Sequence, residues 1–465
     1  MIKVELINHG AINDAKLISF SAKGCYQPEK PIMGETMDIV GKLFKTGHHT
    51  TFQHGYFTFW IEDIAISDVT FGLHLVNPFY NTSQRSGRFC GKMFQNPDYE
   101  EISSYIKTYW PELDEEQLTL AIHFVRDGIV IYQKNLSKAV DFAKELIREE
   151  RPFASEKYID QNAPKFAQEQ LRVFIPTIFP TALTYTANLS AIIAMHCSSW
   201  SPALIDISRK MMDAVISLYP ETLELKKILE IVNEVKHSSK NLKWLPAEDI
   251  FHLTSAIRYN PSAILSPKDK DYSSKFRDAI IPPPEFMHPI DLLHFHPAFM
   301  ENSVSRLESV VNISVATMGQ DQRHRMISRG KPRFTGEFYL PPIPRMCGLT
   351  GEAIALITAW KCLFKQLPKS LALALVPYGA MVSYKKSGSL NAVAHELNKR
   401  LCWTAQEEIY HSALNLRKEI SEKCGADSPL LAIFPPSCVR TGKCGEGDRY
   451  CGRDMKKDCF IERKI

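Results

Sequence analysis

Apolar residues recur at helical spacing along much of the chain, and this pattern predicts most of its regular structure. Arg151-Pro152 marks the end of the first long helix, and Trp200-Ser201-Pro202 predicts a break inside the second. The stretches predicted to be helical are 118–150, 188–218, 222–235, 349–366 and 390–420.

Two further stretches carry strand patterns. Residues 54–61 (HGYFTFWI) alternate aromatic and smaller side chains, and residues 303–318 are rich in Val, Ile and Ser. The second strand is expected to run straight into the polar segment that follows it. Strands and helices are mixed in both halves without a regular βαβ alternation, which favours an α+β class. The polar, proline-containing segment 236–249 (KHSSKNLKWLPAED) is predicted to separate the two halves.

Length and charge narrow the function classes. The chain has 465 residues, which is too long for one ordinary domain, and two or three are expected. Its formal net charge is +4, from 56 basic against 52 acidic residues, so no general field attracts a polyanion. Nucleic-acid-binding domains usually show a basic face or stripe, so nucleic acid is not an expected partner except at a local patch.

The chain carries no recognisable export or membrane signal. Its start, MIKVELINHGAIND, lacks the basic and then apolar regions of a signal peptide, and no run of about eighteen apolar residues occurs. Eleven cysteines without a secretion signal indicate reduced thiols. We therefore expect a soluble, cytoplasmic protein.

One short stretch concentrates cationic side chains. The segment 321–330 (DQRHRMISRG) places Arg323, His324, Arg325 and Arg329 around a short apolar pair. Arg offers a planar fork of donors that matches phosphate, and His adds a titratable or neutral donor. The residues alone leave three interpretations open: a solvated basic turn, a nucleic-acid patch, and a phosphate site for a small molecule.

The C-terminal region is rich in cysteine, glycine and polar residues. Cys438, Cys444, Cys451 and Cys459 have the spacing C-x5-C-x6-C-x7-C, in a segment with too few apolar residues to form a core. Four thiolates suit tetrahedral zinc, which would stabilise so small a unit. The C-x2-C pair typical of zinc sites is missing, so free thiols in an ordered tail are the alternative.

The second half of the chain resembles the flavin-dependent thymidylate synthases (the ThyX family). That family has the signature R-H-R-x-x-S-x-N-E-x-S-x-R, and residues 323–328 (RHRMIS) match its first part, with Gln320 at the family's upstream glutamine. Further on, 395–400 (HELNKR) and 405–409 (AQEEI) match two later family motifs. The tail of the signature is lost here, because Gly330, Lys331, Arg333 and Thr335 replace Asn, Glu, Ser and Arg.

The first half resembles the same family in the complementary places. It keeps the histidine-rich approach with His48 and Thr50, the strand motif FTF at 57–59, and the tail residues Ser83 and Arg85. Residues 172–176 (RVFIP) match the family's R-x-x-L-P motif. The RHR element has become LHL at 73–75, and Asn81 replaces the signature glutamate.

The losses in the two halves complement each other. Leu373 stands where the second half would have the arginine corresponding to Arg172, and Ser199 stands where the first half would have the one corresponding to Arg400. Pro176 precedes Ser199 by 23 residues, and Pro377 precedes Arg400 by 23 residues. We interpret the chain as a diverged tandem duplication, with one repeat over 1–236, a second over 250–425 and a Cys-rich tail over 426–465.

The resemblance implies a fold, a reaction and a composite site. Each repeat is expected to have a central, mainly antiparallel sheet with packed helices, and the chain to form a homodimer. The implied reaction is reductive methylation of dUMP to dTMP, with FAD as cofactor and methylenetetrahydrofolate and NADPH as co-substrates. The residues implied in catalysis are Arg172, Arg323 and Arg400. Those implied in flavin binding are His48, Thr50, Arg323, His324, Arg325, His395 and Arg400. Those implied in nucleotide binding are Ser83, Arg85, Arg172, Gln320 and Arg323.

Two alternatives remain open at this point. The chain could be a catalytically retired relative that still binds flavin or nucleotide, which the loss of the signature glutamate at Asn81 favours. It could also be an RNA-binding protein that uses the RHR segment and the basic tail, with strongly salt-dependent affinity.

Overall fold

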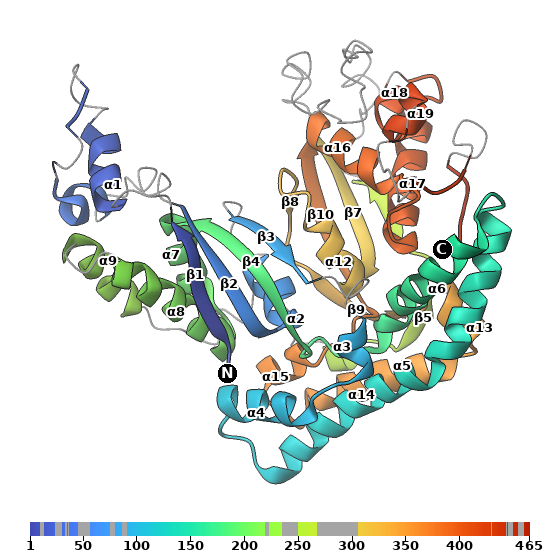
Figure 1. Ribbon diagram of the computed structural model, residues 1–465, viewed down its shortest axis with the longest axis horizontal. Helices are drawn as coiled ribbons and strands as arrows, with labels where there is room; N and C mark the ends of the chain where they lie inside the picture. The colour runs from blue at the N-terminus through green and yellow to red at the C-terminus, as the bar shows by residue number, and fades with distance from the viewer. Residues whose placement is uncertain are drawn as a thin grey trace.

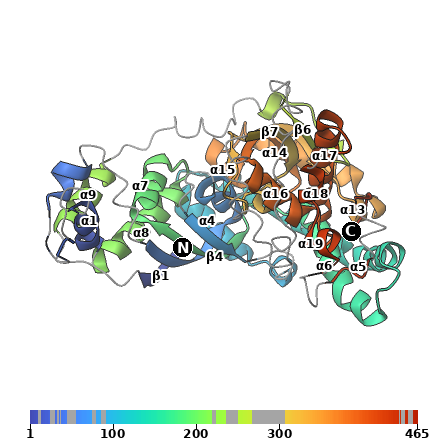
Figure 2. The ribbon, with the colours of Figure 1, turned by 90° about the horizontal axis from the view of Figure 1, so that it is seen from above.

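A computed structural model describes residues 1–9, 14–23, 30–32, 35, 37–44, 56–74, 80–85, 91–218, 223–234, 250–266, 306–428, 430–442, 444, 450–453 and 460–465. Two separate sheets stand next to each other, and helices pack around and below them (Figure 1). Seen from above, α1, α8 and α9 lie at one end of the molecule, and α13, α17 and α6 lie toward the other (Figure 2).

The first sheet is entirely antiparallel, in the order β1-β2-β4-β3. Its central pair joins residues far apart in sequence, with Phe59 opposite Tyr185 and Ala65 opposite Pro180. The strands are β1 (Lys3–His9), β2 (Tyr56–Ala65), β3 (Tyr80–Gln84) and β4 (Pro180–Asn188).

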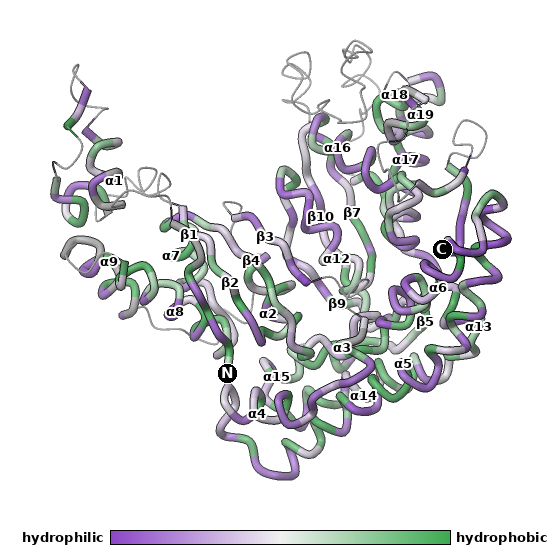
Figure 3. Tube along the Cα trace, in the orientation of Figure 1, coloured by the Kyte–Doolittle hydropathy of each residue, from purple (hydrophilic) through white to green (hydrophobic). Residues whose placement is uncertain are grey.

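The second sheet has the order β5-β9-β10-β7-β6, and β8 also pairs with β10. All its pairings are antiparallel except that of β5 with β9. Figure 3 shows a largely apolar β7 beside a more polar β10. The strands are β5 (Ala256–Arg258), β6 (Ser262–Leu265), β7 (Arg306–Ser314), β8 (Ser328–Arg329), β9 (Arg333–Tyr339) and β10 (Ala380–Ser389).

Helices fill the connections between the strands. The longest, α5, begins at a capping box in which Asp114 and Gln117 satisfy each other's backbone N–H groups. The helices of the first half are α1 (Asp14–Lys23), η1 (Val40–Phe44), α2 (Ile66–Asp68), η3 (Val69–Leu73), α3 (Lys92–Gln95), α4 (Tyr99–Tyr109), α5 (Glu115–Glu150), α6 (Glu156–Leu171), η4 (Arg172–Phe174), α7 (Leu189–Ser198), α8 (Pro202–Leu218) and α9 (Leu223–Asn233).

The second half continues with shorter helices that flank its sheet. They are η6 (Ile250–His252), α12 (Val315–Asp321), α13 (Pro342–Met346), α14 (Thr350–Leu363), α15 (Lys369–Ala374), α16 (Leu390–Arg400), α17 (Glu407–Cys424), α18 (Leu430–Ile433) and α19 (Ser437–Thr441). In the part of the chain that the structure describes, no helix is both long and apolar enough to cross a membrane.

The two sheets share one connectivity. In each set of four strands, the first two along the chain pair with each other. The second strand also pairs with the fourth, which precedes a helix, and the fourth pairs with the third. The order is β1-β2-β4-β3 in the first sheet and β6-β7-β10-β9 in the second.

The two halves meet where the segment around Pro176 pairs with the segment around Pro377. These two prolines form an antiparallel bridge, Thr177 N donates to Val376 O (2.8 Å), and Tyr378 N donates to Ile175 O (3.0 Å). This junction fixes the two halves against each other.

A continuous apolar core runs through both halves and across the junction. The rings of Phe174 and Phe338 lie 5.5 Å apart, and those of Phe71 and Phe334 lie 5.6 Å apart. Helix α5 passes directly behind the junction at Gly128. A Cβ atom there would lie 2.3 Å from Phe174 O and 2.9 Å from Pro176 Cδ, so only glycine permits this approach.

The structure confirms the α+β class, and it corrects two of the predicted elements. The expected strand over 303–318 ends at Ser314, whose hydroxyl caps α12 by accepting from Thr317 N (3.2 Å). The expected helix over 390–420 is two helices, α16 and α17, separated by residues 401–406. The helices predicted over 118–150, 188–218 (with its break), 222–235 and 349–366 are confirmed within a few residues at each end. The boundary segment 236–249 lies outside the described residues.

Gly128→Ala should destabilise the protein although alanine is the better helix former. The added Cβ would press on the backbone oxygen of Phe174, and overpacking of this kind costs about 1–3 kcal/mol. Gly351→Ala, in α14 with no atom within 4 Å of the new Cβ, is the matched control and should leave stability unchanged or slightly raised. Denaturant unfolding of both variants measures the difference, and equal stabilities would contradict the close approach at the junction.

Candidate functional site

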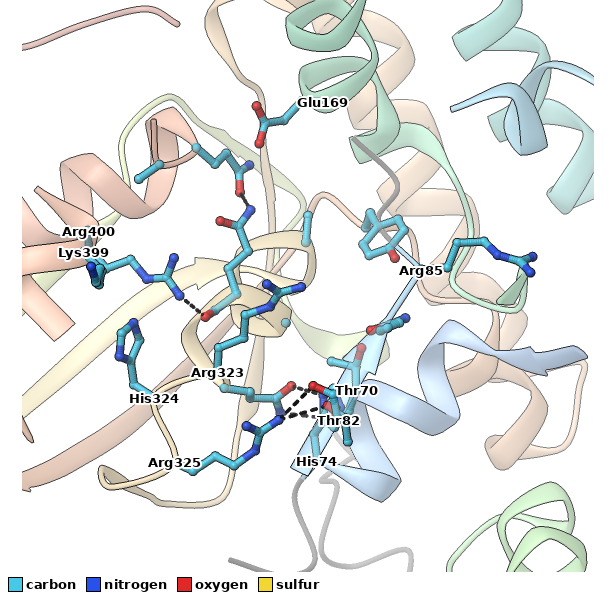
Figure 4. Close-up of a pocket in the computed structure, with 18 of the residues that line it drawn as sticks. Thr70, His74, Thr82, Arg85, Glu169, Arg323, His324, Arg325, Lys399 and Arg400 are labelled. Atoms are coloured by element: carbon cyan, nitrogen blue, oxygen red, sulfur yellow. Dashed lines mark hydrogen bonds between the residues drawn. The ribbon is translucent and has the colours of Figure 1, made fainter. Parts of the chain in front are cut away.

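A cavity of about 540 Å³ lies between the two halves, next to the junction. Its first-half wall comes from η3, β3 and the end of α6, and its second-half wall from α12, the RHR turn, α16 and the loop before α17 (Figure 4). The lining residues are Thr70, His74, Thr82, Gln84, Arg85, Glu169, Arg172, Ala316, Gly319, Gln320, Gln322, Arg323, His324, Arg325, Tyr378, His395, Lys399, Arg400, Thr404, Ala405 and Gln406.

The wall of this cavity is strongly cationic. It carries six guanidinium or ammonium groups and a single carboxylate, that of Glu169. The chain as a whole is close to neutral, so this imbalance is local. A water-filled cleft with one sign of charge on its walls concentrates ligands of the opposite sign. The cavity is therefore suited to an anionic small molecule of nucleotide size.

Arg172 and Arg323 approach the cavity from opposite halves of the chain. Arg172 is only 7% exposed, lies 5.7 Å from the centre of the Tyr378 ring, and has a buried Nε without a hydrogen-bond partner among the described residues. Burial and the neighbouring guanidinium groups of Arg325 and Arg172 lower the pKa of Arg323. Like charges held this close are stabilised by an anion between them.

The second-half wall depends on the break between α16 and α17. Arg400, at the end of α16, donates from Nη2 to Gln320 O (2.5 Å), and the Gln320 amide donates to Gln406 Oε1. Glu408 fixes the start of α17 by accepting from Ser314 N (2.6 Å) and from the Thr317 hydroxyl (2.5 Å). The unbroken helix expected from the sequence could not bring Gln406 to the same wall as Arg400.

His324 and His395 lie beside Arg400 on this wall, with ring centroids 5.4 Å apart in an edge-to-face arrangement. Burial and then the charges of Arg400 and Lys386 hold the pKa of His324 well below its ordinary value. His324 is therefore a neutral ring. Its Nε2 atom is buried without a hydrogen-bond partner in the described part of the chain.

Arg325 crosses from the second half to the first. Its guanidinium donates to Asn81 Oδ1 (2.9 Å) and to Thr82 Oγ1 (3.0 Å) on β3, and it lies 5.0 Å from the centre of the Tyr80 ring. Asn81, which stands at the position of the family's glutamate, thus accepts from the arginine of the other half. Figure 4 shows Arg325 beside Thr82, at the side of the cavity opposite Glu169.

Arg329 turns away from the cavity and holds the RHR turn from behind. It donates from Nε to Asp321 Oδ2 (2.5 Å) and from Nη1 to His324 O (3.1 Å) and Ile327 O (2.9 Å). Burial would raise the pKa of Asp321, but Arg329 and Lys386 hold it well below its ordinary range. One cation of the cluster is thus neutralised internally, which leaves Arg323 and Arg325 on the cavity side.

The structure does not bring every expected site residue into the cavity. Arg85 lines it but points away from Arg323 (Figure 4). Ser83 is exposed and does not line it, because alternate residues of β3 face opposite sides and Thr82 and Gln84 occupy the cavity side. His48 and Thr50 lie outside the described residues.

The predicted zinc site has no support in the described residues. Cys438, Cys444 and Cys451 have free thiols, and Cys459 lies outside the described part. No group of three or more Cys, His, Asp or Glu side chains suited to holding a metal occurs among the described residues. Burial, with the nearby thiols of Cys402, Cys444 and Cys451, raises the pKa of Cys438 to about 12.

Sequence reasoning missed several residues of the cavity. Glu169 precedes Arg172 by one helical turn, so helical spacing alone could have added it. Thr82 follows from the period-two alternation of a strand that was not predicted. No sequence motif pointed to Tyr378 or Gln322, because both reach the cavity through contacts between the halves. His74, the middle residue of LHL at 73–75, also lines the cavity.

Two leucines of the decayed motifs lie in the core and do not line the cavity. Leu73 and Leu373 are both fully buried. Next to Leu73 in the chain, Phe71 packs against Phe334, and Leu204 leaves no room for a side chain at position 72.

Comparisons with known proteins agree with the resemblance in the first half. Residues 5–221 match the model of the family Thy1, thymidylate synthase complementing protein. Among proteins with curated descriptions, none matches the chain.

Some solved structures share a loose likeness. A thymidylate synthase X from Helicobacter pylori, solved with FAD and dUMP, has 13% identity and a TM-score of 0.31, over 46% of this chain and 92% of that one. A UMP/dUMP methylase, PolB, from Streptomyces cacaoi, bound with 5-Br UMP, has 15% identity and a TM-score of 0.28, over 49% of this chain and 94% of that one.

Arg329→Ala should cost about 3–5 kcal/mol of stability, because it leaves the buried Asp321 short of a partner and releases the RHR turn. Arg258→Ala removes a comparable but exposed ion pair with Glu337, and it should cost about 1 kcal/mol or less. Urea unfolding compares the two. Similar losses would mean that the buried network does not hold the turn.

Proposed function

We propose that the chain is a flavin-dependent thymidylate synthase that methylates dUMP to dTMP, which the match of residues 5–221 to the thymidylate synthase complementing protein model supports. The single observation that carries the proposal is the composite cavity. Arg172 from the first half and Arg323 from the second face the same cationic space. If each half has lost the family motifs that the other keeps, the remaining motifs can form a complete site only together.

The donors around the cavity fit ligands that carry phosphate. Guanidinium groups bind phosphate through two parallel hydrogen bonds, and most of the six cations here come from arginine. Arg172 Nε, Gln406 Nε2 and His324 Nε2 are buried donors or acceptors without a partner among the described residues. Buried polar atoms rarely stay unsatisfied, so a polar ligand in this space accounts for them. These residues fit both a nucleotide and a flavin.

We assign the two walls to the two ligands. Arg172, Gln320 and Arg323 would bind dUMP, where a guanidinium beside the pyrimidine stabilises the negative charge that develops on the activated base. His324, His395, Arg325 and Arg400 would hold the flavin and its phosphates. When bound, the flavin would supply the hydride, reduced in turn by NADPH, and methylenetetrahydrofolate would supply the carbon. No cysteine nucleophile is assigned.

The composite site also supports the tandem duplication. Two sheets with one connectivity, joined where corresponding segments pair antiparallel, are expected if one ancestral unit was duplicated. We retain the repeats as 1–236 and 250–425, with 426–465 as a separate tail. Because a subunit pair in the family would become one fused chain, a homodimer is the expected assembly.

If the proposed function is right, the purified chain should form dTMP from dUMP and methylenetetrahydrofolate in the presence of FAD and NADPH. Arg172→Ala and Arg323→Ala should each lower turnover by about a hundredfold or more, because each removes a charge-assisted contact to the same ligand. Arg126→Ala, on the exposed face of α5, is the matched control. Separation of labelled nucleotides by chromatography measures the product.

Each outcome of this assay has a clear meaning. Turnover that persists in either arginine variant would contradict a composite site. A chain that binds FAD and dUMP but forms no dTMP would be a retired relative, with Asn81 in place of the glutamate as the first position to restore.

One site per chain is expected for dUMP, because Leu73 and Leu373, which the proposed duplication relates to Arg323 and Arg172, are fully buried apolar residues. Titration calorimetry with dUMP should therefore give a stoichiometry near one per chain. A value near two would show that the apolar position can open.

A further inference from the structure

His74 is retained within a motif whose two arginines have been lost, and it lies at the contact between the halves. Its Nδ1 is 3.3 Å from Gln322 Oε1 in the second half, and its Nε2 is 3.0 Å from Thr82 Oγ1 on β3. Both partners line the cavity. The histidine therefore connects the two walls of the site.

The chemistry of the neighbours fixes the direction of each hydrogen bond. Thr70 O can only accept, so the NH₂ group of Gln322 faces it (2.9 Å) and the Gln322 carbonyl oxygen faces His74. His74 must then donate from Nδ1 to that oxygen. Its Nε2 is left as the acceptor, and the Thr82 hydroxyl donates to it.

The same chain of bonds continues to Arg325. The Thr82 hydroxyl donates its one hydrogen to His74, and its oxygen accepts from Arg325 Nη2 (3.0 Å). The bonds thus run from Arg325 through Thr82 and His74 to Gln322, and from Gln322 to Thr70. This path crosses between the halves three times.

Aromatic contacts hold the histidine ring in place. It stacks on Tyr80 with centroids 5.7 Å apart and planes 5° apart, and the Tyr80 hydroxyl donates to His74 O (2.7 Å). Tyr80 stacks in turn on Tyr185 of β4, and Arg325 covers it at 5.0 Å. The orientation of the ring is thus set by the first sheet.

The electrostatic surroundings keep the ring neutral, as the bonding pattern requires. Burial, with the charges of Arg325 and then of Arg323 and Arg329, lowers the pKa of His74 to about 3. Among the described residues, the titratable and charged groups around the ring are these three arginines and Tyr80. A histidine with a depressed folded pKa contributes stability that is complete above the unfolded pKa, near 6.5, and is lost as the pH falls from there toward 3.

We propose that His74 is a positioning residue that, as the Nδ1–H tautomer, fixes Gln322 and, through Thr82, Arg325 in the composite site. A residue of the decayed motif has then been kept for a new task, which is to lock one half of the chain to the other. The effect on ligand binding rests on the proposed function, whereas the tautomer and the bonding pattern do not.

The first test measures dUMP affinity by calorimetry and, where turnover is present, KM and kcat. His74→Phe keeps the stacked ring but removes both hydrogen bonds, and it should weaken dUMP binding about tenfold to a hundredfold, with a larger effect on KM than on kcat. His74→Gln offers one acceptor and one donor and should restore part of the affinity.

His196→Ala is the control for a general loss of stability. His196 is fully buried and bonds Ser208 (2.7 Å), but it does not line the cavity. This variant should lose stability without losing dUMP affinity. Equal effects on affinity from positions 74 and 196, or unchanged affinity in His74→Phe, would overturn the positioning role.

The second test does not depend on the ligand. Nitrogen NMR of the histidine-labelled protein should show His74 as the Nδ1–H tautomer, with no titration between pH 8 and 5, and Thr82→Val should shift its Nε2 signal. An Nε2–H tautomer, or titration near pH 6.5, would overturn the proposal. If the unmodified chain bound no dUMP, the proposed function would fail, and the NMR result would still decide the role of His74.

Discussion

The antiparallel bridge between Pro176 and Pro377 is the constraint on which the site depends. Its hydrogen bonds hold the segment after Arg172 against the segment that contains Tyr378, so that the arginine of one half lies over the aromatic ring of the other. Helix α5 supports the bridge from behind through the close approach at Gly128. A cavity shared by two halves can keep its shape only if their relative position is fixed at one point, and this junction fixes it.

Near that junction, some cationic side chains of the second half face the protein interior and others face the cavity. Arg329 and Lys386 face inward and are compensated by Asp321 and Glu396, in a network that is almost fully buried. Arg323 faces outward into the cavity, where Glu169 is the single carboxylate in the wall. Buried charges persist when they are paired, whereas an unpaired cationic wall costs repulsion that an anionic ligand would relieve. The inward network therefore stabilises the turn and the outward arginine is left to bind.

Under the proposed duplication, the two halves have diverged in their chemistry. At one of two related positions the polar donors remain, and at the other leucine and phenylalanine fill the space and contribute to the core. Converting the second position to core adds apolar burial, which is worth about 25 cal/mol per Å². The cavity carries the opposite cost, because its six cationic groups lie together with one carboxylate, that of Glu169, among the described lining residues. The apolar position thus helps to support the polar one.

The sequence by itself determined the helices with clear 3.6-residue periodicity, the α+β class, and the pairing of motifs that places Arg172 and Arg323 in one site. These features follow from local patterns or from spacing along the chain. Only the tertiary structure decided that Arg329 faces inward, that α16 and α17 separate at residues 401–406, that Thr82 rather than Ser83 faces the cavity, and that His74 bonds both halves. Each of these depends on a partner from another part of the fold, as with Gln322 for His74 and Ser314 for Glu408. Hydrogen bonding and burial are properties of such pairs, so residues far apart in sequence acquire them only when the chain has folded.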